Sequence, residues 1–337
     1  MKRISIIQLL TVVLAGLLLA ACTTKKVGYV YNEGAVFGTF YHFTYDSLAG
    51  DQHQAILEVL EAFNHSLSTY DSTSVISRFN RGEKGVKADA WFKQVFETAK
   101  GISAQSDGAF DMTVAPLVNA WGFGFNKIDQ VTPQVVDSLK QLVGMNYITI
   151  DSQDIIVSEK PGVMLDASAI AKGFGVDVVA DFLRSKGVRN FLVEIGGELA
   201  TAGVNPRGNP WRVGIDKPVD DPQVVNRELQ FVVQLSGKAM ATSGNYRNFY
   251  VKDGKKFAHT IDPRTGYPVE HSLLSATIVA NDCMTADAYA TACMVLGLAR
   301  SKVLIESLQG VEACFIYQDT DAMKVYLTAG FEKYCAE

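Results

Sequence analysis

The sequence lacks the short motifs that mark several large enzyme classes. It contains no H-E-x-x-H, no G-x-S-x-G, no P-loop and no G-x-G-x-x-G dinucleotide fingerprint. Its five histidines are scattered, and none of them pair at the spacing of a helix face. A zinc protease, a serine hydrolase and a Rossmann dehydrogenase therefore lack support.

Clustered positive charge is absent as well. Lys and Arg total 31 against 36 Asp and Glu, which gives a formal net charge of −5 for the 337 residues, and no basic block appears. We therefore expect no nucleic-acid partner. The five cysteines match no zinc-binding pattern, and their spacing alone gives no disulfide pairing. Cys293 lies among apolar residues and is predicted to be a buried core thiol.

The start of the sequence has the pattern of an export signal. Lys2 and Arg3 precede an apolar run, residues 4–19, that is shorter than the about 20 residues of a comfortable transmembrane helix. The run ends in Leu-Ala-Ala-Cys22, which resembles a bacterial lipobox, so we expect Cys22 to be lipidated and to anchor the chain on a membrane. An ordinary signal peptide with a chance cysteine is the alternative. The predicted organisation is a signal peptide at 1–21, a lipidated cysteine and linker at 22–33, and the protein body at 34–337.

Apolar periodicity and turn residues predict an α/β protein (α+β mixed) with mixed sheets flanked by helices, whose strand order cannot be deduced. One helix, at 51–67, places Ile56, Leu60, Phe63 and Leu67 on one face. Further helices are expected after the cap Asp89, from Thr132-Pro133 to about 142, and at 168–185, 285–296 and 299–308. Strands are expected at 36–45, 162–165, 191–195, 211–215, 231–235, 257–261, 274–280, 312–317 and 323–327. The segments 162–165, 168–185 and 191–195 read as a βαβ unit.

A carboxylate and a lysine flank the start of one predicted helix. Asp166 follows the predicted strand at 162–165, small residues come next, and Lys172 lies about one turn into the helix. A helix N-terminus with exposed N–H groups suits a phosphate, and Lys172 would add positive charge. The alternative is a capping Asp166 and a surface Lys172.

A second pattern suits a hard metal ion. Asp287 and Thr291 are four residues apart and share one helix face, with small residues between them. A carboxylate, a hydroxyl and nearby backbone carbonyls are the oxygen ligands that Mg²⁺ takes alongside substrate phosphate. The alternative is a helix start with Thr285 as its cap and Asp287 interacting with the helix dipole.

Two further segments hold candidate site residues. His259 precedes an Asp-Pro-x-x-Gly turn and is a possible proton acceptor, although a lone histidine is often structural. Small residues and aromatics at 108–117 and 121–124 are able to line a slot for a flat ring; a core turn with glycine punctuation is the alternative.

The order of ten short blocks resembles the ApbE family of FAD:protein FMN transferases. The resemblance runs from about Val36 to the C-terminus and rests on F-G-T at 37–39, L-S-T-Y at 67–70, S-R-F-N at 77–80, G-A-F-D-M-T-V-A-P-L-V at 108–118, W-G-F-G at 121–124, D-A-S-A-I-A-K-G at 166–173, G-G-E at 196–198, A-T-S-G-N-Y-R-N at 241–248, H-T-I-D-P-R-T-G at 259–266 and T-A-D-A-Y-A-T-A at 285–292. It implies an ApbE-like fold and an enzyme that splits FAD with Mg²⁺, attaches FMN through a phosphoester to a Thr or Ser of a target protein, and releases AMP. Targets in this family are typically subunits of membrane redox pumps.

The resemblance also implies roles for individual residues. Asp287 and Thr291 would bind Mg²⁺ with their side chains, and Ala169 and Ala290 would bind it with their backbone carbonyls. FAD would contact Phe37, Tyr70, Ala109, Phe110, Asp111, Asp166, Lys172 and Ile261. Phe37 stands where relatives often have Met, and D-A-S-A replaces a motif that in many relatives has a glycine pair.

Some parts of the reaction stay open at this point. His259 is the candidate base, with Asp287 and Asp166 as rivals. A Mg²⁺-dependent FAD pyrophosphatase and a flavin-binding lipoprotein without catalysis are alternative functions. Thr23 follows Cys22 where an Asp commonly signals inner-membrane retention, but the expected pump targets lie in that membrane. We therefore expect a lipid anchor on the periplasmic side of the inner membrane.

Overall fold

The computed structural model describes residues 28–124, 130–218, 228–245, 249–252, 255–320 and 322–336. The predicted signal peptide, Cys22 and part of the predicted linker lie outside these residues. An eight-stranded sheet forms the centre, with the strand order β1 (Tyr29–Val36), β2 (Thr39–Asp46), β5 (Phe191–Ile195), β6 (Glu198–Ala202), β9 (Ala239–Gly244), β12 (Leu273–Ala280), β13 (Glu312–Asp319) and β14 (Ala322–Leu327). Three two-stranded sheets accompany it: β3 (Ile148–Ile150) with β4 (Ile156–Ser158), β7 (Trp211–Asp216) with β8 (Leu229–Leu235), and β10 (Phe249–Lys252) with β11 (Lys255–Ala258).

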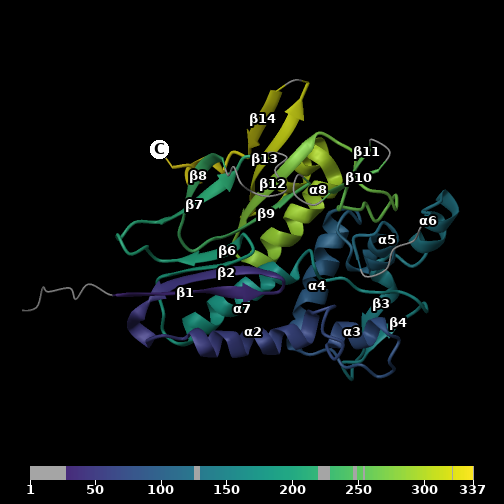
Figure 1. The fold of residues 1–337 in the computed structure, drawn as a ribbon, viewed down its shortest axis with the longest axis horizontal. Coiled ribbons are helices and arrows are strands. Elements are labelled where there is room, and N and C mark those ends of the chain that lie inside the picture. The colour runs from purple at the N-terminus through teal and green to yellow at the C-terminus, as the bar shows by residue number, and fades with distance from the viewer. Residues whose placement is uncertain are drawn as a thin grey trace, which may run out of the picture.

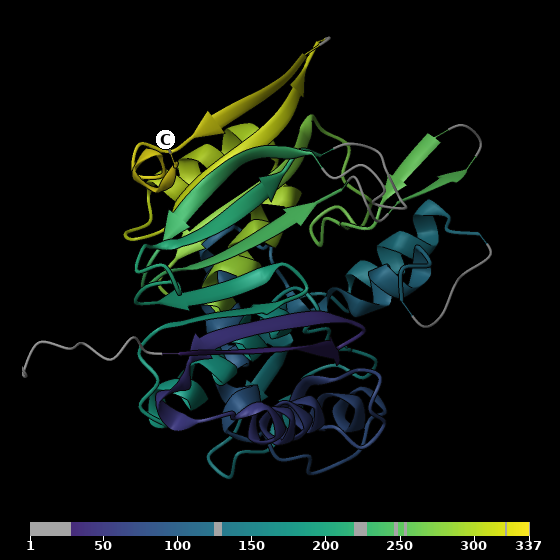
Figure 2. The ribbon, with the colours of Figure 1, turned by 60° about the vertical axis from the view of Figure 1, so that its left-hand side comes forward.

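Helices cover one face of the central sheet, as Figures 1 and 2 show for α7 and α8. The α-helices among the described residues are α2 (His53–Leu67), α3 (Val75–Asn80), α4 (Ala90–Gln105), α5 (Ala115–Ala120), α6 (Pro133–Lys140), α7 (Ala171–Ser185) and α8 (Cys283–Glu306). Short 3₁₀ turns lie at Ser47–Ala49, Met112–Val114, Met145–Tyr147 and Glu332–Tyr334. The hairpin β10–β11 and the helices α5 and α6 lie at the same end of the molecule in both views.

Several local predictions are confirmed. Ile56, Leu60, Phe63 and Leu67 are all buried on one face of α2. The Asp89 carboxylate accepts a hydrogen bond from the N–H of Phe92 at 2.8 Å and caps α4. Thr132 caps α6, whose first residue is a proline. These features depend on neighbouring residues, so the sequence pattern was enough to find them.

The predicted βαβ unit is wrong. Residues 162–165 form no strand, and every neighbouring pair in the central sheet is antiparallel. The helix begins at Ala171 instead of residue 168, because residues 168–170 form a turn. The protein therefore has an α+β arrangement, in which helices pack on an antiparallel sheet.

The predicted strand at 36–45 proves to be part of a hairpin. Phe37 and Gly38 both have positive φ, 52° and 73°, and reverse the chain between β1 and β2. A two-residue turn of this kind matches the twist of the strands that it joins. The predicted strand at 257–261 is also too long, since β11 ends at Ala258 and Ile261 forms only an isolated bridge with Pro268.

Helix α8 is the central helix of the core. It combines the two helices predicted at 285–296 and 299–308, with a break at Gly297, where φ is 71°. It is long and apolar enough to cross a membrane, but 61% of its most apolar stretch is buried inside the protein. Such burial is typical of a core helix. The predicted core thiol Cys293 is fully buried here, and Cys283, Cys314 and Cys335 are also free thiols.

Candidate active site

A cavity of about 610 Å³ opens beside the N-terminal half of α8. Its size is that of a typical ligand site. All the residues predicted to contact flavin, bind metal or accept a proton line this cavity, except Phe37 and Ala290. The lining residues that the sequence predicted are Tyr70, Ala109, Phe110, Asp111, Asp166, Ala169, Lys172, His259, Ile261, Asp287 and Thr291.

Asp287 and Thr291 lie one turn apart on α8 and face the cavity together. The Asp287 side chain is almost fully buried, and its Oδ2 accepts a hydrogen bond from the N–H of Gly173 at 3.0 Å. The alternative that placed Thr285 as the helix cap is wrong, because Asp282 caps α8 and accepts the N–H of Thr285 at 2.8 Å. Asp287 therefore has a role inside the protein and not at an exposed helix end.

Lys172, on α7, lies next to the Asp287 carboxylate. Its Nζ donates a hydrogen bond to Glu198 Oε1 at 2.9 Å and lies 3.9 Å from Asp287 Oδ2. Burial disfavours the ammonium, but the carboxylates of Asp287 and Glu198 outweigh burial and raise the pKa of Lys172. Burial raises the pKa of Glu198, although the Lys172 ammonium opposes that shift. Lys172 thus carries a fixed positive charge in the cavity lining; its side chain is half-buried and held by two buried carboxylates, unlike a free surface lysine.

The segment before α7 is held by residues distant in sequence. Asn80, at the end of α3, donates to the carbonyl of Leu165 at 2.8 Å and accepts the N–H of Leu165 at 2.7 Å. The N–H of Asp166 donates to the carbonyl of Met112 at 2.7 Å, and Asp166 Oδ1 accepts the N–H of Ser168 at 2.8 Å. Asp166 therefore caps a turn and not α7 itself. Its side chain is fixed at the cavity wall by this turn.

Residues of the predicted slot for a flat ring also line the cavity. Ala109 and Phe110 are buried, and Asp111 accepts hydrogen bonds from the N–H of Thr113 at 2.7 Å and the N–H of Met145 at 3.2 Å. Burial raises the pKa of Asp111, while these hydrogen bonds counteract that shift. The wall therefore combines apolar surface with one well-ordered carboxyl group.

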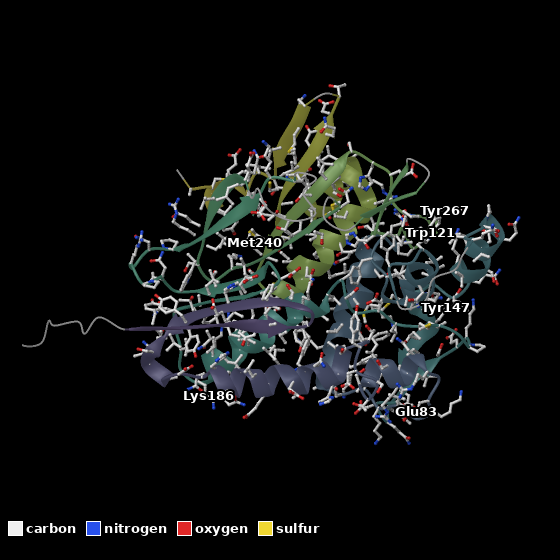
Figure 3. The ribbon with its side chains drawn as sticks, in the orientation of Figure 1. Glu83, Trp121, Tyr147, Lys186, Met240 and Tyr267 are labelled. Carbon is white, nitrogen blue, oxygen red and sulfur yellow. The ribbon has the colours of Figure 1, made fainter. Side chains whose placement is uncertain are left out.

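The turn that carries His259 and Ile261 is tied to α5. Trp121, which ends α5, donates its indole N–H to the carbonyl of Gly266 at 2.8 Å, and its ring lies 5.7 Å from that of Tyr267. Figure 3 shows these two aromatic residues side by side. The ring of His259 lies edge-on to Phe123, with 6.4 Å between centroids. Phe123 is itself a lining residue, so His259 stands against the aromatic wall of the cavity.

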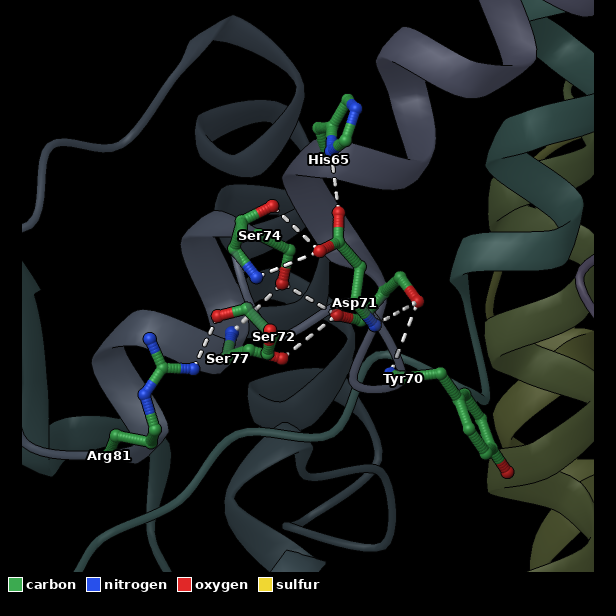
Figure 4. Close-up of polar contacts among 9 residues, drawn as sticks. His65, Tyr70, Asp71, Ser72, Ser74, Ser77 and Arg81 are labelled. Atoms are coloured by element: carbon green, nitrogen blue, oxygen red, sulfur yellow. Dashed lines mark hydrogen bonds and ion pairs between the residues drawn. The ribbon is translucent and has the colours of Figure 1, made fainter.

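Tyr70 stands on the rim. Ser68 Oγ accepts the N–H groups of Tyr70 and Asp71, each at 3.2 Å, and the Ser68 carbonyl accepts the hydroxyls of Ser74 at 2.6 Å and Ser77 at 3.1 Å. Figure 4 shows the Tyr70 ring pointing away from this hydrogen-bonded loop. Its side chain is 87% exposed, so a rigid loop presents a large ring to solvent beside the cavity. The same loop also borders a second hollow of about 270 Å³, which shares Asp166 with the first.

Phe37 and Ala290 lie away from the cavity lining. Phe37, in the β1–β2 turn, packs against Phe63 with 5.6 Å between ring centroids. A Cβ on Gly175 of α7 would lie 2.9 Å from the same ring, which shows how closely α7 approaches it. Ala290 is buried within α8, one residue before Thr291. A flavin contact by the Phe37 ring and a metal contact by the Ala290 carbonyl therefore stay predictions.

Comparison with known proteins identifies this arrangement. A sequence profile of the ApbE family matches residues 37–315. An FAD:protein FMN transferase from Vibrio cholerae is 36% identical over 335 residues, which cover 97% of this chain and 98% of that protein. The chain belongs to the ApbE family. An FAD:protein FMN transferase from Escherichia coli K12 is 33% identical over 316 residues, 90% of this chain and 88% of that one.

Solved ApbE structures share the fold. The flavin transferase ApbE from Vibrio cholerae superimposes with a TM-score of 0.81 at 35% identity, over 91% of this chain and 99% of that one. The apo form of the flavinyl transferase ApbE from Pseudomonas stutzeri gives the same TM-score at 32% identity, over 92% and 98% of the two chains. The ApbE-like fold expected from the sequence blocks is confirmed, and the chain is an enzyme of the flavin transferase type.

Several polar residues of this ApbE-family site were missed among the individual sequence predictions, among them Glu198 and Ser243. Glu198 holds Lys172, and Ser243 of β9 lines the cavity with its Oγ 3.4 Å from Thr291 Oγ1. Both belong to ordered blocks of the resemblance, G-G-E at 196–198 and A-T-S-G at 241–244, which were the available signal. Neither residue has a local pattern of its own, because each reaches the site through its place in the sheet.

The side chains at this site fit a Mg²⁺ ion. Within the residues that the structure describes, no three His, Cys, Asp or Glu side chains converge as they do at a zinc site. One carboxylate and one hydroxyl, from Asp287 and Thr291, are instead the sparse oxygen set that Mg²⁺ uses together with water and substrate phosphate. The buried charges also favour a cation, because Asp287 and Glu198 outnumber Lys172 by one negative charge when all three are ionised.

Proposed function

We propose that this chain is a Mg²⁺-dependent FAD:protein FMN transferase. In the proposed reaction, the hydroxyl of a Thr or Ser on a target protein attacks the FMN phosphorus of FAD. A phosphoester bond forms, the bond from that phosphorus to the bridging oxygen breaks, the hydroxyl proton leaves and AMP departs. One observation carries the proposal: a single cavity of about 610 Å³, the size of a typical ligand site, is lined by Lys172, Asp287 and Thr291 together with Ala109 and Phe110.

The chain's own residues supply binding and electrostatics for this reaction. Lys172 would supply a permanent positive charge next to the pyrophosphate oxygens, which gain negative charge in the reaction. Asp287, Thr291 and the carbonyls of Ala169 and Ala290 would hold Mg²⁺, which when bound stabilises the charge that develops on those oxygens. The buried slot at Ala109 and Phe110 suits a flat ring and would keep the flavin in one orientation.

His259 is the proposed base. It lines the cavity, whereas the rival Asp287 already accepts the N–H of Gly173 and lies 3.9 Å from the Lys172 ammonium. The other rival, Asp166, accepts the N–H of Ser168. An ionised carboxylate paired with an ammonium is a weak proton acceptor, so the imidazole of His259 is the better candidate for the hydroxyl proton.

The proposal is tested with FAD, Mg²⁺ and a purified candidate acceptor, a redox-pump subunit with an exposed Thr or Ser. Flavin fluorescence that stays with the acceptor on a denaturing gel is the expected result. Free FMN and AMP without labelled protein would instead establish the pyrophosphatase, and FAD binding with no AMP would establish a flavin-binding protein. Asp287→Ala should abolish labelling, whereas Arg78→Ala, which removes the exposed ion pair between Arg78 of α3 and Glu83, should not.

We also propose that Cys22 is lipidated and holds the enzyme on the periplasmic face of the inner membrane. This proposal rests on the lipobox-like sequence and on the membrane location of the expected targets. Labelling of cells with a palmitate analogue should mark the wild-type chain and not Cys22→Ser. Recovery of the wild-type chain in the soluble periplasmic fraction would contradict the anchor.

A further inference from the structure

Lys172, Glu198 and Asp287 form a charge cluster that joins three elements of the fold, in which both carboxylates are buried and the lysine side chain is 32% exposed. Lys172 comes from α7, Asp287 from α8, and Glu198 is the first residue of β6. The turn that delivers Glu198 consists of Gly196 and Gly197, whose φ values of 63° and 100° favour glycine. Glu198 is only 5% exposed, so its carboxylate is committed to the protein interior.

The Lys172 ammonium is placed unequally between the two carboxylates. It lies 2.9 Å from Glu198 Oε1, within hydrogen-bond distance, but 3.9 Å from Asp287 Oδ2. Asp287 Oδ2 accepts the N–H of Gly173 at 3.0 Å. Glu198 Oε2 is buried and has no hydrogen-bond partner among the described residues, so its Oε1–Lys172 contact is the polar interaction that the structure gives this side chain.

Loss of the Glu198 charge would change where Lys172 binds. A buried carboxylate attracts the nearest positive charge, and Asp287, 3% exposed, would be the remaining carboxylate of the cluster. The flexible lysine stem needs to move its ammonium by only about 1 Å to make a hydrogen bond with Asp287. That ion pair would occupy the carboxylate that the cation needs.

We propose that Glu198 is a positioning residue, which holds the Lys172 ammonium off Asp287 and so keeps the Asp287 carboxylate available to a divalent cation. The inference rests on the cation site of the proposed function. It assigns Glu198 no contact with FAD or with the acceptor. Its effect on the reaction passes through Lys172 and Asp287.

The net charge of the cluster predicts the relative cation affinities of the wild type, two single variants and their double variant. With all groups ionised, the wild-type cluster has one surplus negative charge, and Glu198→Gln has none. Lys172→Met has two surplus negative charges. The double variant Glu198→Gln/Lys172→Met has one, on Asp287, with no ammonium left to pair with it. The expected order of affinity is therefore Lys172→Met first, wild type and the double variant next, and Glu198→Gln last.

The test is isothermal titration of Mn²⁺ into each full-length variant at pH 8, without flavin, with free Mn²⁺ checked by electron paramagnetic resonance. Mn²⁺ favours the same oxygen ligands as Mg²⁺. Glu198→Gln should bind Mn²⁺ roughly 10- to 100-fold more weakly, which is the typical cost of losing an outer-shell residue of a metal site. Adding Lys172→Met to that variant should restore binding. The control Glu228→Gln removes the same charge from a Lys–Glu pair with Lys217 on the surface hairpin β7–β8 and should bind as wild type does.

Two results would overturn the inference. One is wild-type affinity in Glu198→Gln; the other is a double variant that binds as weakly as Glu198→Gln, because Glu198 would then act on the fold and not on Lys172. If Glu198→Gln does not fold, Lys172→Met alone decides. This variant removes the ammonium near Asp287, so an Mn²⁺ affinity that does not rise would contradict any influence of Lys172 on the cation site. A wild-type chain that binds no Mn²⁺ would instead refute the cation site of the proposed function.

Discussion

Gly173→Ala is a sharp test of how the two site helices are fitted together. A Cβ at this position would lie 2.3 Å from the carbonyl oxygen of Cys283 and 2.7 Å from Asp287 Cβ, where ordinary contacts are 3.4–4 Å. The oxygen belongs to the backbone of α8, so no side-chain rotation relieves the clash. Helices α7 and α8 must therefore separate by about 1 Å, which also lengthens the hydrogen bond from Gly173 N–H to Asp287.

The expected cost differs for stability and for activity. Overpacking of this kind costs about 1–3 kcal/mol, and the better helix propensity of alanine offsets about 1 kcal/mol of it. We therefore expect a stability loss of about 0–2 kcal/mol. A displacement of about 1 Å between Lys172 and Asp287 should lower the rate of FMN transfer roughly 100-fold.

The assay combines urea unfolding with transfer rates measured by flavin fluorescence on a denaturing gel. Gly101→Ala is the matched control, because Gly101 is exposed in α4 and a Cβ there meets no atom within 4 Å. It should gain about 1 kcal/mol of stability and keep wild-type activity. A Gly173→Ala variant with wild-type stability and rate would refute the close fit of α7 against α8.

Three further predictions concern residues around the site. Burial raises the pKa of Asp177 from 3.8 to about 7, so its contribution to stability is complete below pH 3.8 and is lost as pH rises through 7. Between pH 4 and 8 the melting temperature of Asp177→Asn should therefore fall less than that of wild type. Equal pH profiles for the two proteins would contradict the raised pKa. Asn80→Ala leaves the N–H and the carbonyl of Leu165 without their partner. It should lower the free energy of unfolding in urea by about 2–4 kcal/mol and raise the KM for FAD. An unchanged urea midpoint would show that Asn80 does not hold this segment. Trp121→Phe removes the hydrogen bond to Gly266 and should cost about 1 kcal/mol while lowering the transfer rate, and unchanged values of both would exclude a positioning role for Trp121.

Local features of the fold were predictable because they depend on residues near each other in the chain. The apolar face of α2, the Asp89 cap of α4 and the break at Gly297 each follow from periodicity or from one backbone conformation. The β1–β2 turn was missed because Phe37, a residue without glycine's freedom, takes a positive φ there. The predicted βαβ unit failed because strand direction depends on neighbours that a local pattern does not specify.

The sequence by itself determined which residue types the site contains. The four-residue spacing of Asp287 and Thr291 places them on one face of any helix, and the ordered blocks indicated the ApbE family. Only the tertiary structure decided how the charges meet: Lys172 is 26 residues from Glu198, and Gly173 is 114 residues from Asp287. Contacts over such separations arise from the packing of α7 between β6 and α8, and hydrophobic periodicity carries no information about which carboxylate a buried lysine will reach.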